Sequence, residues 1–363
     1  MPASLVSAWP RLGERLARAS LGNFPTPVER LERLERELGC GPLYVKRDDQ
    51  SSPLYGGNKV RALEVLFGLA RAAGAREIVA VGPYGSNQAV ATALHAPRFG
   101  LDAGAILFAQ PPSLAAFSNL RVIAARCSTQ IVLPHWSLVP AAMWRERRRE
   151  RFVLAPGGAT PEGTLGHVAA GLELAAQIGR GELLPPREIY VPVGSTCTSA
   201  GLLVGLLHGA RLGLGPSVPP CVVAVRITPW PVASRFRILG LAARASQRLA
   251  ELTGERLSLS SAELGKYLRV DGRELGAGYG FATAAGRAAS ELLARTAELS
   301  LDATYSAKAA AAFVHAARQR REGPFLFWST KSSAPLPEVA PDELERAAPR
   351  LLAWMAASRR SSD

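Results

Sequence analysis

The chain has 363 residues, of which 48% are hydrophobic, and a formal net charge of +13 at pH 7. This length allows one large α/β unit, or two lobes, around a sizeable core. No apolar run is long enough to cross a membrane, and charged residues between Arg11 and Arg18 interrupt any signal-peptide core. The Arg- and Ala-rich start leaves a transit peptide open, but the simpler interpretation is a first helix that leads into Pro25.

Basic residues are densest in one short stretch, which holds Arg145, Arg147, Arg148, Arg149 and Arg151. Such a patch could bind nucleic acid. Aromatic residues are sparse there, however, and no nucleic-acid-binding motif occurs in the sequence. Because charge runs usually solvate a helix, we interpret the stretch as a solvated helix face and expect no nucleic-acid partner.

The four cysteines, Cys40, Cys127, Cys197 and Cys221, are scattered and form no Cys-x-x-Cys pair. That spacing disfavours a zinc site and a disulfide framework, and it suits a reducing compartment. We therefore expect a cytoplasmic protein that holds no metal and has no membrane partner.

Segments typical of strands and of helices alternate along most of the chain. This order predicts parallel sheets with helices on both faces, which is an α/β fold. A Pro- and Gly-rich run at 213–220 is expected to be a surface connection, and residues 358–363 are expected to be frayed. The expected strands cover 43–47, 77–82, 105–109, 130–133, 188–193, 222–227 and 325–328, and the expected helices cover 60–73, 89–98, 166–178 and 200–209.

The most informative stretch is Gly56-Gly57-Asn58-Lys59, which lies between the expected strand 43–47 and the expected helix 60–73. Two glycines allow a sharp turn and the close approach of a ligand. A lysine at a helix start is poorly placed for structure, because the helix dipole is positive at that end. The dipole and burial would lower the pKa of Lys59 and make its amine nucleophilic, whereas the alternative is an ordinary surface lysine.

The surrounding motifs favour the nucleophile. The stretches 25–27, 44–49 and 56–59 occur in the order in which they open the fold-type II pyridoxal-phosphate (PLP) enzymes. The chain resembles, more narrowly, the family of D-cysteine desulfhydrase and 1-aminocyclopropane-1-carboxylate (ACC) deaminase. This resemblance implies that Lys59, with Asn58 beside it, binds pyridoxal 5'-phosphate as an internal aldimine.

The same resemblance implies the domain organisation. Fold-type II enzymes have two lobes, each a mostly parallel sheet with helices on both faces, and the cofactor lies between them. We expect a larger PLP-binding lobe of residues 1–51 and 157–363, and a smaller lobe of residues 52–156. Relatives are usually homodimers, so a homodimer is expected here.

The stretch Ser86-Asn87-Gln88 lies between the expected strand 77–82 and the expected helix 89–98. Open α/β sheets bind ligands at this edge, and a hydroxyl and two amides at a helix start can bind a carboxylate. Helix capping by Ser86 or Asn87 is the alternative. The resemblance implies that all three bind the substrate carboxylate, with Ser86 also catalytic and Asn87 also beside the cofactor's 3-hydroxyl group.

The stretch Gly194-Ser195-Thr196-Cys197-Thr198 follows the expected strand 188–193 and leads into the expected helix 200–209. Backbone N–H groups and hydroxyls there could cradle a phosphate, although a capped structural turn is the alternative. The stretch resembles the family's phosphate loop, with Thr196 and Cys197 in place of two glycines. The resemblance implies that these five residues bind the phosphate of PLP.

Tyr279 and Tyr305 match two active-site tyrosines of the family. Phenols there could bind a substrate carboxylate or move a proton, and two half-buried aromatics are the alternative. Ser306 holds the position that, in the family, lies near the pyridine nitrogen, where deaminases have a glutamate and desulfhydrases a small hydroxyl residue. A hydroxyl does not keep that nitrogen protonated as a carboxylate would.

The last stretch is Ser329-Thr330-Lys331-Ser332, after the expected strand 325–328. It aligns with a loop that borders the cofactor ring, His-Thr-Gly-Gly in desulfhydrases and His-Leu-Gly-Gly in deaminases. Thr330 matches the desulfhydrases and is expected to contact the cofactor. Ser329 replaces the histidine, and Lys331 and Ser332 replace the glycines.

The expected function is therefore that of a PLP-dependent lyase acting on a small amino acid. A D-cysteine desulfhydrase-like β-elimination would give a keto acid, ammonia and sulfide, with Lys59 as the base at Cα. The runner-up is ACC deaminase, which Ser306 and Thr330 disfavour. A PLP-binding relative without catalysis stays open as an alternative of another class, because a fold does not guarantee its function.

Overall fold

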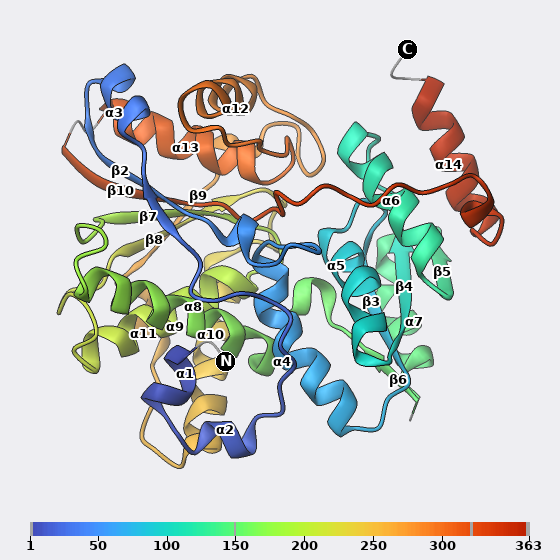
Figure 1. The fold of residues 1–363 in the computed structure, drawn as a ribbon, viewed down its shortest axis with the longest axis horizontal. Coiled ribbons are helices and arrows are strands. Elements are labelled where there is room, and N and C mark those ends of the chain that lie inside the picture. Colours follow the sequence, from blue (N-terminus) through green and yellow to red (C-terminus); the bar gives the residue numbers. More distant parts are fainter. Residues whose placement is uncertain (1–2, 149, 320–321, 361–363) are drawn as a thin grey trace.

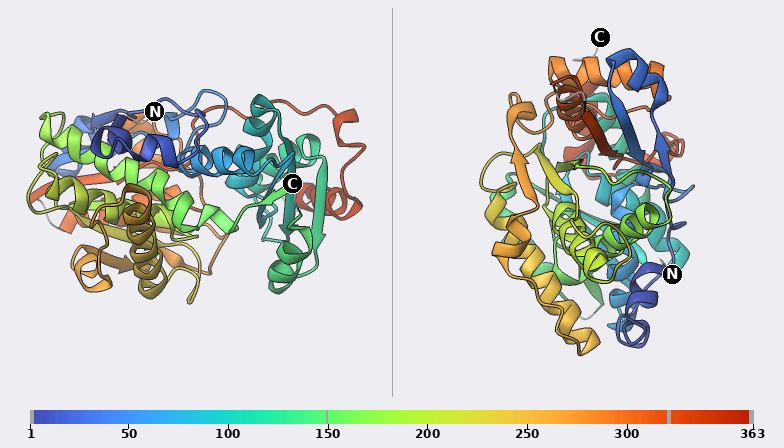
Figure 2. Two further views of the ribbon diagram at one scale, coloured as in Figure 1. Left: turned by 90° about the horizontal axis from the view of Figure 1, so that it is seen from below. Right: turned by 90° about the vertical axis from the view of Figure 1, so that its left-hand side faces the viewer.

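The computed structural model describes residues 3–148, 150–319 and 322–360. It contains two β-sheets side by side, each with helices packed on it (Figure 1). The molecule is elongated, with the larger sheet toward one end and the smaller toward the other (Figure 2). Helix α4 (Asn58–Ala72) lies between them, so its first turn is well placed for a site shared by both halves.

The elements follow the alternation that the sequence predicts. The strands are β1 (Val28–Arg30), β2 (Gly41–Lys46), β3 (Glu77–Pro83), β4 (Asp102–Phe108), β5 (Thr129–Leu133), β6 (Arg151–Val153), β7 (Glu188–Val193), β8 (Cys221–Arg226), β9 (Leu268–Asp271) and β10 (Glu322–Trp328). The other helices are α1 (Ala3–Ala8), α2 (Leu12–Arg15), α3 (Glu32–Leu38), α5 (Asn87–His95), α6 (Leu114–Arg126), α7 (Val139–Glu146), α8 (Pro161–Gly179), α9 (Cys197–Arg211), α10 (Arg235–Thr253), α11 (Ser261–Gly265), α12 (Ala284–Ala297), α13 (Ser306–Gln319) and α14 (Pro349–Arg360).

The larger sheet has the strand order β1-β2-β10-β7-β8-β9, and every pair is parallel except β1 with β2. Successive residues of β7 point to opposite faces, as the pleat requires. Ile189 and Val191 pack on one side with α8, α9 and α10, whereas Tyr190 packs on the other side with α12 and α13. Both faces are therefore buried, which explains why β7 is apolar almost throughout.

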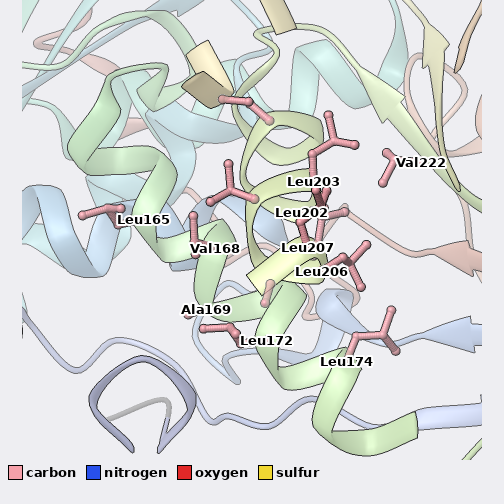
Figure 3. Packing of buried hydrophobic residues seen from close by; sticks show 14 of the residues in the cluster. Leu165, Val168, Ala169, Leu172, Leu174, Leu202, Leu203, Leu206, Leu207 and Val222 are labelled. Carbon is pink, nitrogen blue, oxygen red and sulfur yellow. The ribbon is translucent and has the colours of Figure 1, made fainter. Parts of the chain in front are cut away.

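The pair α8 and α9 forms the centre of the larger core (Figure 3). Leu165, Val168 and Leu172 of α8 belong to the same buried cluster as Leu203 of α9, which lies near Val222 of β8. The two helix backbones approach closely, because a Cβ on Gly171 would lie 2.8 Å from Cα of Gly205. This close packing fixes the start of α9 against α8.

The smaller sheet has the order β5-β4-β3-β6 and is entirely parallel. Ile78 and Ala80 of β3 pack with α4, α5 and α6, whereas Val79 and Val81 pack toward α7. The two sheets together make the α/β fold that the sequence predicts. The lobe boundaries at 51/52 and 156/157 stay a prediction.

After β10 the chain passes over to the helices of the smaller sheet, where α14 packs beside α6 (Figure 1). Leu351 and Met355 are buried there, and Trp354 makes an edge contact with Tyr84 at 5.4 Å between ring centroids. The expected fraying from residue 358 is wrong for 358–360, because α14 continues to Arg360 and Ser358 donates to Trp354 O. Residues 361–363 lie outside the described residues.

The interpretation of the basic stretch as a helix face is also wrong. Only Arg145 lies on α7, and Arg151 lies on β6, where it forms 2.5 Å ion pairs with Glu77 and Glu146. The arginines therefore span a helix end, a turn and a strand. Arg149 lies outside the described residues.

All the expected strands and helices exist, with small shifts at their ends. The sequence did not reveal β1, β6 and β9, nor the helices α3, α6, α7 and α10 to α14. The run at 213–220 is an irregular connection between α9 and β8, as expected. Within the described ranges, every helix is too short or too polar to span a bilayer.

Candidate active site

The start of α4 is built from backbone contacts with the end of β10. Gly57 has φ +91°, and a Cβ there would lie 2.5 Å from Thr330 O. The next amide, Asn58 N, donates to the same carbonyl at 2.9 Å. Only glycine tolerates both the conformation and the contact. Lys59 follows in the first turn of α4, the helix that lies between the two sheets (Figure 1).

The surroundings of Lys59 favour a neutral amine. Burial lowers the pKa of Lys59, and Cys197 partly opposes that shift. His167 of α8 interacts electrostatically with Lys59. Burial, together with the nearby Lys59 and Arg61 charges, lowers the pKa of His167 well below its ordinary value. The imidazole is buried, and neither ring nitrogen has a hydrogen-bond partner among the described residues. Lys59 is therefore within electrostatic reach of the Cys197 thiol and of the His167 imidazole.

A buried ionic network fixes the helix that carries Lys59. The Arg61 guanidinium pairs with Asp48 at 2.7 Å and with Glu173 of α8 at 3.0 Å. Glu173 also accepts from Lys46 Nζ at 2.5 Å. Planar, two-sided guanidinium contacts of this kind set orientation as well as distance. The network joins β2, α4 and α8 and thereby sets where Lys59 lies.

The stretch Ser86–Gln88 lies at the start of α5, as expected. The Ser86 hydroxyl caps the helix, accepting from Ala89 N at 3.2 Å, so the capping alternative holds for this residue. The Asn87 side-chain oxygen accepts from Tyr55 at 3.0 Å and from Asn119 at 2.9 Å.

Gln88 differs from both neighbours. Its side chain is 3% exposed, yet neither its amide oxygen nor its amide nitrogen has a partner within the described part of the chain. A buried amide without partners is costly, so its presence indicates a bound group that completes the hydrogen bonds.

The loop Gly194–Thr198 connects β7 to α9. Thr196 has φ +73°, a left-handed conformation that β-branched residues rarely adopt. Thr198 Oγ1 accepts from Asn58 Nδ2 at 2.8 Å, which ties the loop to the Lys59 stretch. Cys197 donates to Gly158 O at 3.3 Å. The backbone amides at the start of α9 therefore face the region next to Lys59, and a strained residue at such a turn is typical of a ligand site.

Tyr279 and Tyr305 are in contact with each other. Their hydroxyl oxygens are 2.6 Å apart, and the rings meet edge to face at 5.7 Å. Burial raises the pKa of both phenols, so both are protonated near neutral pH. Lys308 Nζ donates to Leu275 O at 2.8 Å and to Gly278 O at 2.9 Å, which anchors the loop that carries Tyr279.

Ser306 is the first residue of α13, next to Tyr305. The Asp302 carboxylate caps this helix by accepting from the backbone amides of Thr304, Tyr305 and Ser306 at 2.7–3.1 Å. The Ser306 hydroxyl is buried and has no partner among the residues that the structure describes. It is thus a buried hydroxyl available to a ligand.

The loop after β10 is bonded to the turn before Lys59, and the side chain of Ser332, which replaces a glycine of the family pattern, takes part in this contact. Ser332 Oγ accepts from Gly56 N at 2.9 Å, and Lys331 forms an antiparallel bridge with Gly57. Ser329 is buried and its amide donates to Lys46 O at 3.0 Å. The loop therefore supports the turn before Lys59 directly.

A small cleft joins the smaller half to the larger half. It brings together three of the expected site residues, Asn87, Tyr279 and Tyr305, but Lys59, Ser86 and Gln88 are not among its lining residues. The lining residues are Gly85, Asn87, Gln110, Ser113, Ala115, Ala116, Asn119, Tyr279, Asp302, Thr304, Tyr305 and Lys331.

Sequence reasoning missed four residues of this site. Tyr55 and Asn119 hold the Asn87 side chain, His167 lies beside Lys59, and Gln110 lines the cleft. The histidine carried a weak signal, since it follows the Gly-x-x-Gly run that ends at Gly166. Tyr55 directly precedes the Gly56–Lys59 motif, but the motif gives its hydroxyl no role. Gln110 and Asn119 lie outside every motif that the sequence analysis identified.

The pyridoxal-phosphate dependent enzyme family matches residues 19–330 of this chain, and the chain belongs to that family. Its cofactor is therefore pyridoxal 5'-phosphate. Among characterised relatives, nocardicin C-9' epimerase of Nocardia uniformis subsp. tsuyamanensis is 36% identical over 89% of this chain and 95% of its own length. D-cysteine desulfhydrase of Salmonella choleraesuis (strain SC-B67) is 32% identical over 87% of this chain and 94% of its own.

Solved structures agree with this membership. A crystal structure of an ACC deaminase homologue has a TM-score of 0.73 and 27% identity, covering 92% of this chain and 96% of that one. A fungal L-serine ammonia-lyase from Rhizomucor miehei, at 18% identity and a TM-score of 0.55, shares the fold. The chain is thus a fold-type II enzyme related to D-cysteine desulfhydrases and ACC deaminases.

The described residues fit the cofactor. The buried polar atoms without partners include those of Gln88, Ser199 and Ser306, and all three residues lie in the first turn of a helix at the predicted site. Such atoms are normally satisfied, so polar groups bound at these three helix starts account for them. A neutral amine at Lys59 suits an aldehyde, and helix N-termini suit a phosphate.

Proposed function

We propose that the protein is a PLP-dependent lyase that eliminates a β-substituent from a small amino acid, giving a keto acid and ammonia, and sulfide when cysteine is the substrate. The observation that carries this choice is Ser306. Its buried, unpartnered hydroxyl is a neutral group at the position where the family's deaminases have a glutamate. A hydroxyl can bind an unprotonated ring nitrogen, but it supplies no negative charge to keep that nitrogen protonated.

The cofactor would be held from three directions. Lys59 Nζ would bind its aldehyde, and Asn58, Asn87 and Thr330 would border its ring. The loop Gly194–Thr198 would hold its phosphate at the start of α9. When bound, PLP supplies the electron sink that lets a proton leave Cα of the substrate.

Residues of the chain would then carry the proton and the charge. Lys59, released from the cofactor, would take the Cα proton, for which its lowered pKa is suited. Ser86, Asn87 and Gln88 would bind the substrate carboxylate. Tyr279 and Tyr305, kept protonated by burial, would donate hydrogen bonds to the substrate and a proton to the departing group.

The test is release of keto acid from a panel of amino acids under matched conditions. D-Cysteine and β-chloro-D-alanine are expected to give pyruvate, while ACC is expected to be inert. β-Elimination needs less carbanion stabilisation, because the leaving group departs as the proton is lost. Efficient release of 2-oxobutanoate from ACC, with no product from the cysteine analogues, would overturn the proposal in favour of the deaminase.

Epimerisation at Cα is the second candidate, and the 36% identical nocardicin C-9' epimerase favours it. The first step would be the same proton removal by Lys59, and return of the proton to the opposite face would replace loss of a substituent. Formation of the opposite configuration at Cα, detected by chiral chromatography in amino acid that carries solvent deuterium at Cα and is recovered without keto acid, would establish it. Recovery of unlabelled starting material would exclude it for the amino acid tested.

A relative that binds PLP without catalysis is the candidate of another class. A yellow protein that turns over no amino acid, and exchanges no Cα proton, would support it. We also propose a cytoplasmic homodimer, on the strength of the family alone, and light scattering of the purified holoenzyme tests the oligomeric state.

A further inference from the structure

The cleft between the two halves contains a lysine that nothing else uses. Lys331 is half-buried and lines the cleft together with Tyr279 and Tyr305. Within the described ranges, its ammonium has no hydrogen bond or ion pair, in contrast to the ammonium groups of Lys46 and Lys308. An unpaired cation beside the predicted substrate position is a feature that the elimination itself does not explain.

The acidic residue of the cleft does not neutralise this lysine. Both carboxylate oxygens of Asp302 accept from backbone amides at the start of α13, at distances of 2.7–3.1 Å. Its charge is therefore committed to the helix N-terminus, where the dipole is positive. Among the lining residues of the described chain, Lys331 is the cation and Asp302 the anion, so the uncommitted charge is positive.

The facing wall is also built to donate hydrogen bonds. The Gln110 side-chain oxygen accepts from Gly85 N at 3.0 Å, which leaves its amide nitrogen as a donor. Ser113 lines the same wall, and its hydroxyl, which accepts from Ala116 N at 3.2 Å, keeps its proton to donate. Asn119 also lines this wall, but its amide nitrogen already donates to Gly85 O and to Asn87 Oδ1. Donors on one side and a cation on the other are complementary to an anion.

The backbone of Lys331 is held firmly in place. Its bridge to Gly57 puts it beside the turn before Lys59. On its other side, Ser333 N and Ser333 Oγ both bond to Asp49 O, at 3.1 and 3.2 Å. The backbone of Lys331 is therefore fixed beside the turn that leads into Lys59.

We propose that Lys331 binds a second anionic group, carried on the side chain of the amino-acid substrate. This inference rests on the proposed function, in which Ser86, Asn87 and Gln88 take the α-carboxylate and leave Lys331 for another acid group. The substrate class is then an amino acid whose β-substituent or side-chain end carries a carboxylate or a comparable anion. A glycine at this position, as in the family pattern, supplies no such selection.

Calorimetric titration of the holoenzyme tests the proposal without turnover. 2-Aminoadipate and its side-chain amide have the same shape and differ only in the distal charge, and neither carries a leaving group. The acid is expected to bind at least about tenfold more tightly than the amide, in either enantiomer that binds, because a charge-assisted hydrogen bond is stronger than a neutral one. Equal affinities, or no binding of either compound, would overturn the proposal.

Variants assign the effect to one residue. Lys331→Gln is expected to bring the ratio of acid to amide affinity close to one by weakening the acid alone, and Lys331→Arg is expected to preserve the ratio. Lys266→Gln, at an exposed position outside the cleft, is the matched control and should leave the ratio unchanged. If Lys331→Gln weakens acid and amide equally, the lysine binds the α-carboxylate and the proposal is wrong.

The experiments distinguish failure of the lyase activity from failure of the anion site. Absence of keto acid from β-chloro-alanine, with the preference for the acid intact, would contradict the lyase but retain the anion site. Keto acid from β-chloro-alanine, without a preference for the acid, would retain the lyase and remove the anion site.

Discussion

The hydroxyl oxygens of Tyr279 and Tyr305 are 2.6 Å apart, although the two residues belong to different loops and are 26 positions apart in sequence. One hydroxyl of such a pair donates to the other, which leaves one proton to donate outward. Because burial raises the pKa of both phenols, the pair keeps its protons at neutral pH. This arrangement suits a donor to the substrate better than a base.

Removing either hydroxyl should impair turnover more than cofactor binding. We expect Tyr279→Phe and Tyr305→Phe each to lower kcat about a hundredfold, the lower end for loss of a positioned proton donor. The cofactor absorbance should be unchanged. Tyr267→Phe, outside the cleft, is the control and should retain full activity. Loss of absorbance in either variant would instead place that tyrosine in cofactor binding.

The left-handed conformation of Thr196 predicts an unusual response to glycine. A residue other than glycine in the left-handed conformation lowers stability by about 1–2 kcal/mol. Glycine avoids this strain, although the extra backbone entropy that it loses on folding lowers stability by about 0.5–1 kcal/mol. We expect Thr196→Gly to leave the free energy of unfolding unchanged or to raise it by up to about 1 kcal/mol. Urea denaturation of the apoprotein measures the change.

The matched control for this substitution lies in a regular helix. Thr92→Gly in α5 should lower the free energy of unfolding by at least about 1 kcal/mol, because it removes a fully buried side chain and because glycine is a poor helix former. Equal destabilisation by Thr196→Gly and Thr92→Gly would show that Thr196 is not strained.

The ionic network under α4 predicts how stability depends on pH. Burial raises the pKa of Asp48, but the Arg61 charge and its hydrogen bonds outweigh burial, so the pKa lies below its ordinary value. A pKa lower in the folded than in the unfolded state adds stability above the unfolded value, about 3.9, and that stability is lost as pH falls through the folded value. Chemical denaturation between pH 7 and pH 3 should show this loss.

Asp48→Asn isolates the contribution. The substitution leaves the Arg61 charge buried without one of its two carboxylate partners, which should lower the free energy of unfolding by about 3–5 kcal/mol at pH 7. On acidification the variant should lose less stability than the unmodified protein. Glu251→Gln removes an exposed pair with Arg248 and should cost about 1 kcal/mol or less. A small effect of Asp48→Asn, equal to that of Glu251→Gln, would contradict the role given to the network.

The sequence predicted those parts of the fold that depend on local pattern. Buried strands such as β7 are recognisable as short apolar runs and long helices such as α8 by their length, and Gly57 marks a turn that only glycine allows. Short strands such as β6, with three residues, have no such signal, because their pairing depends on the neighbouring strand. The helix face expected for the basic stretch failed for this reason.

The site was predictable where one motif supplies several residues. Contacts between residues far apart in the sequence could not be predicted. The Lys46 ammonium donates to Glu173, 127 positions further along the chain, and His167 lies near Lys59 only because α8 packs against α4 and α9. The sequence shows that Lys331 replaces a glycine of the family pattern. Only the structure shows that its unpaired charge lies in the cleft.

The central claim is that Lys59 binds the cofactor, and chemical labelling tests it most directly. Borohydride reduction of the holoenzyme, followed by peptide mapping, should place the pyridoxyl group on Lys59, and Lys59→Arg should abolish the label. A pyridoxyl group on another lysine, such as Lys308 or Lys331, would contradict the account.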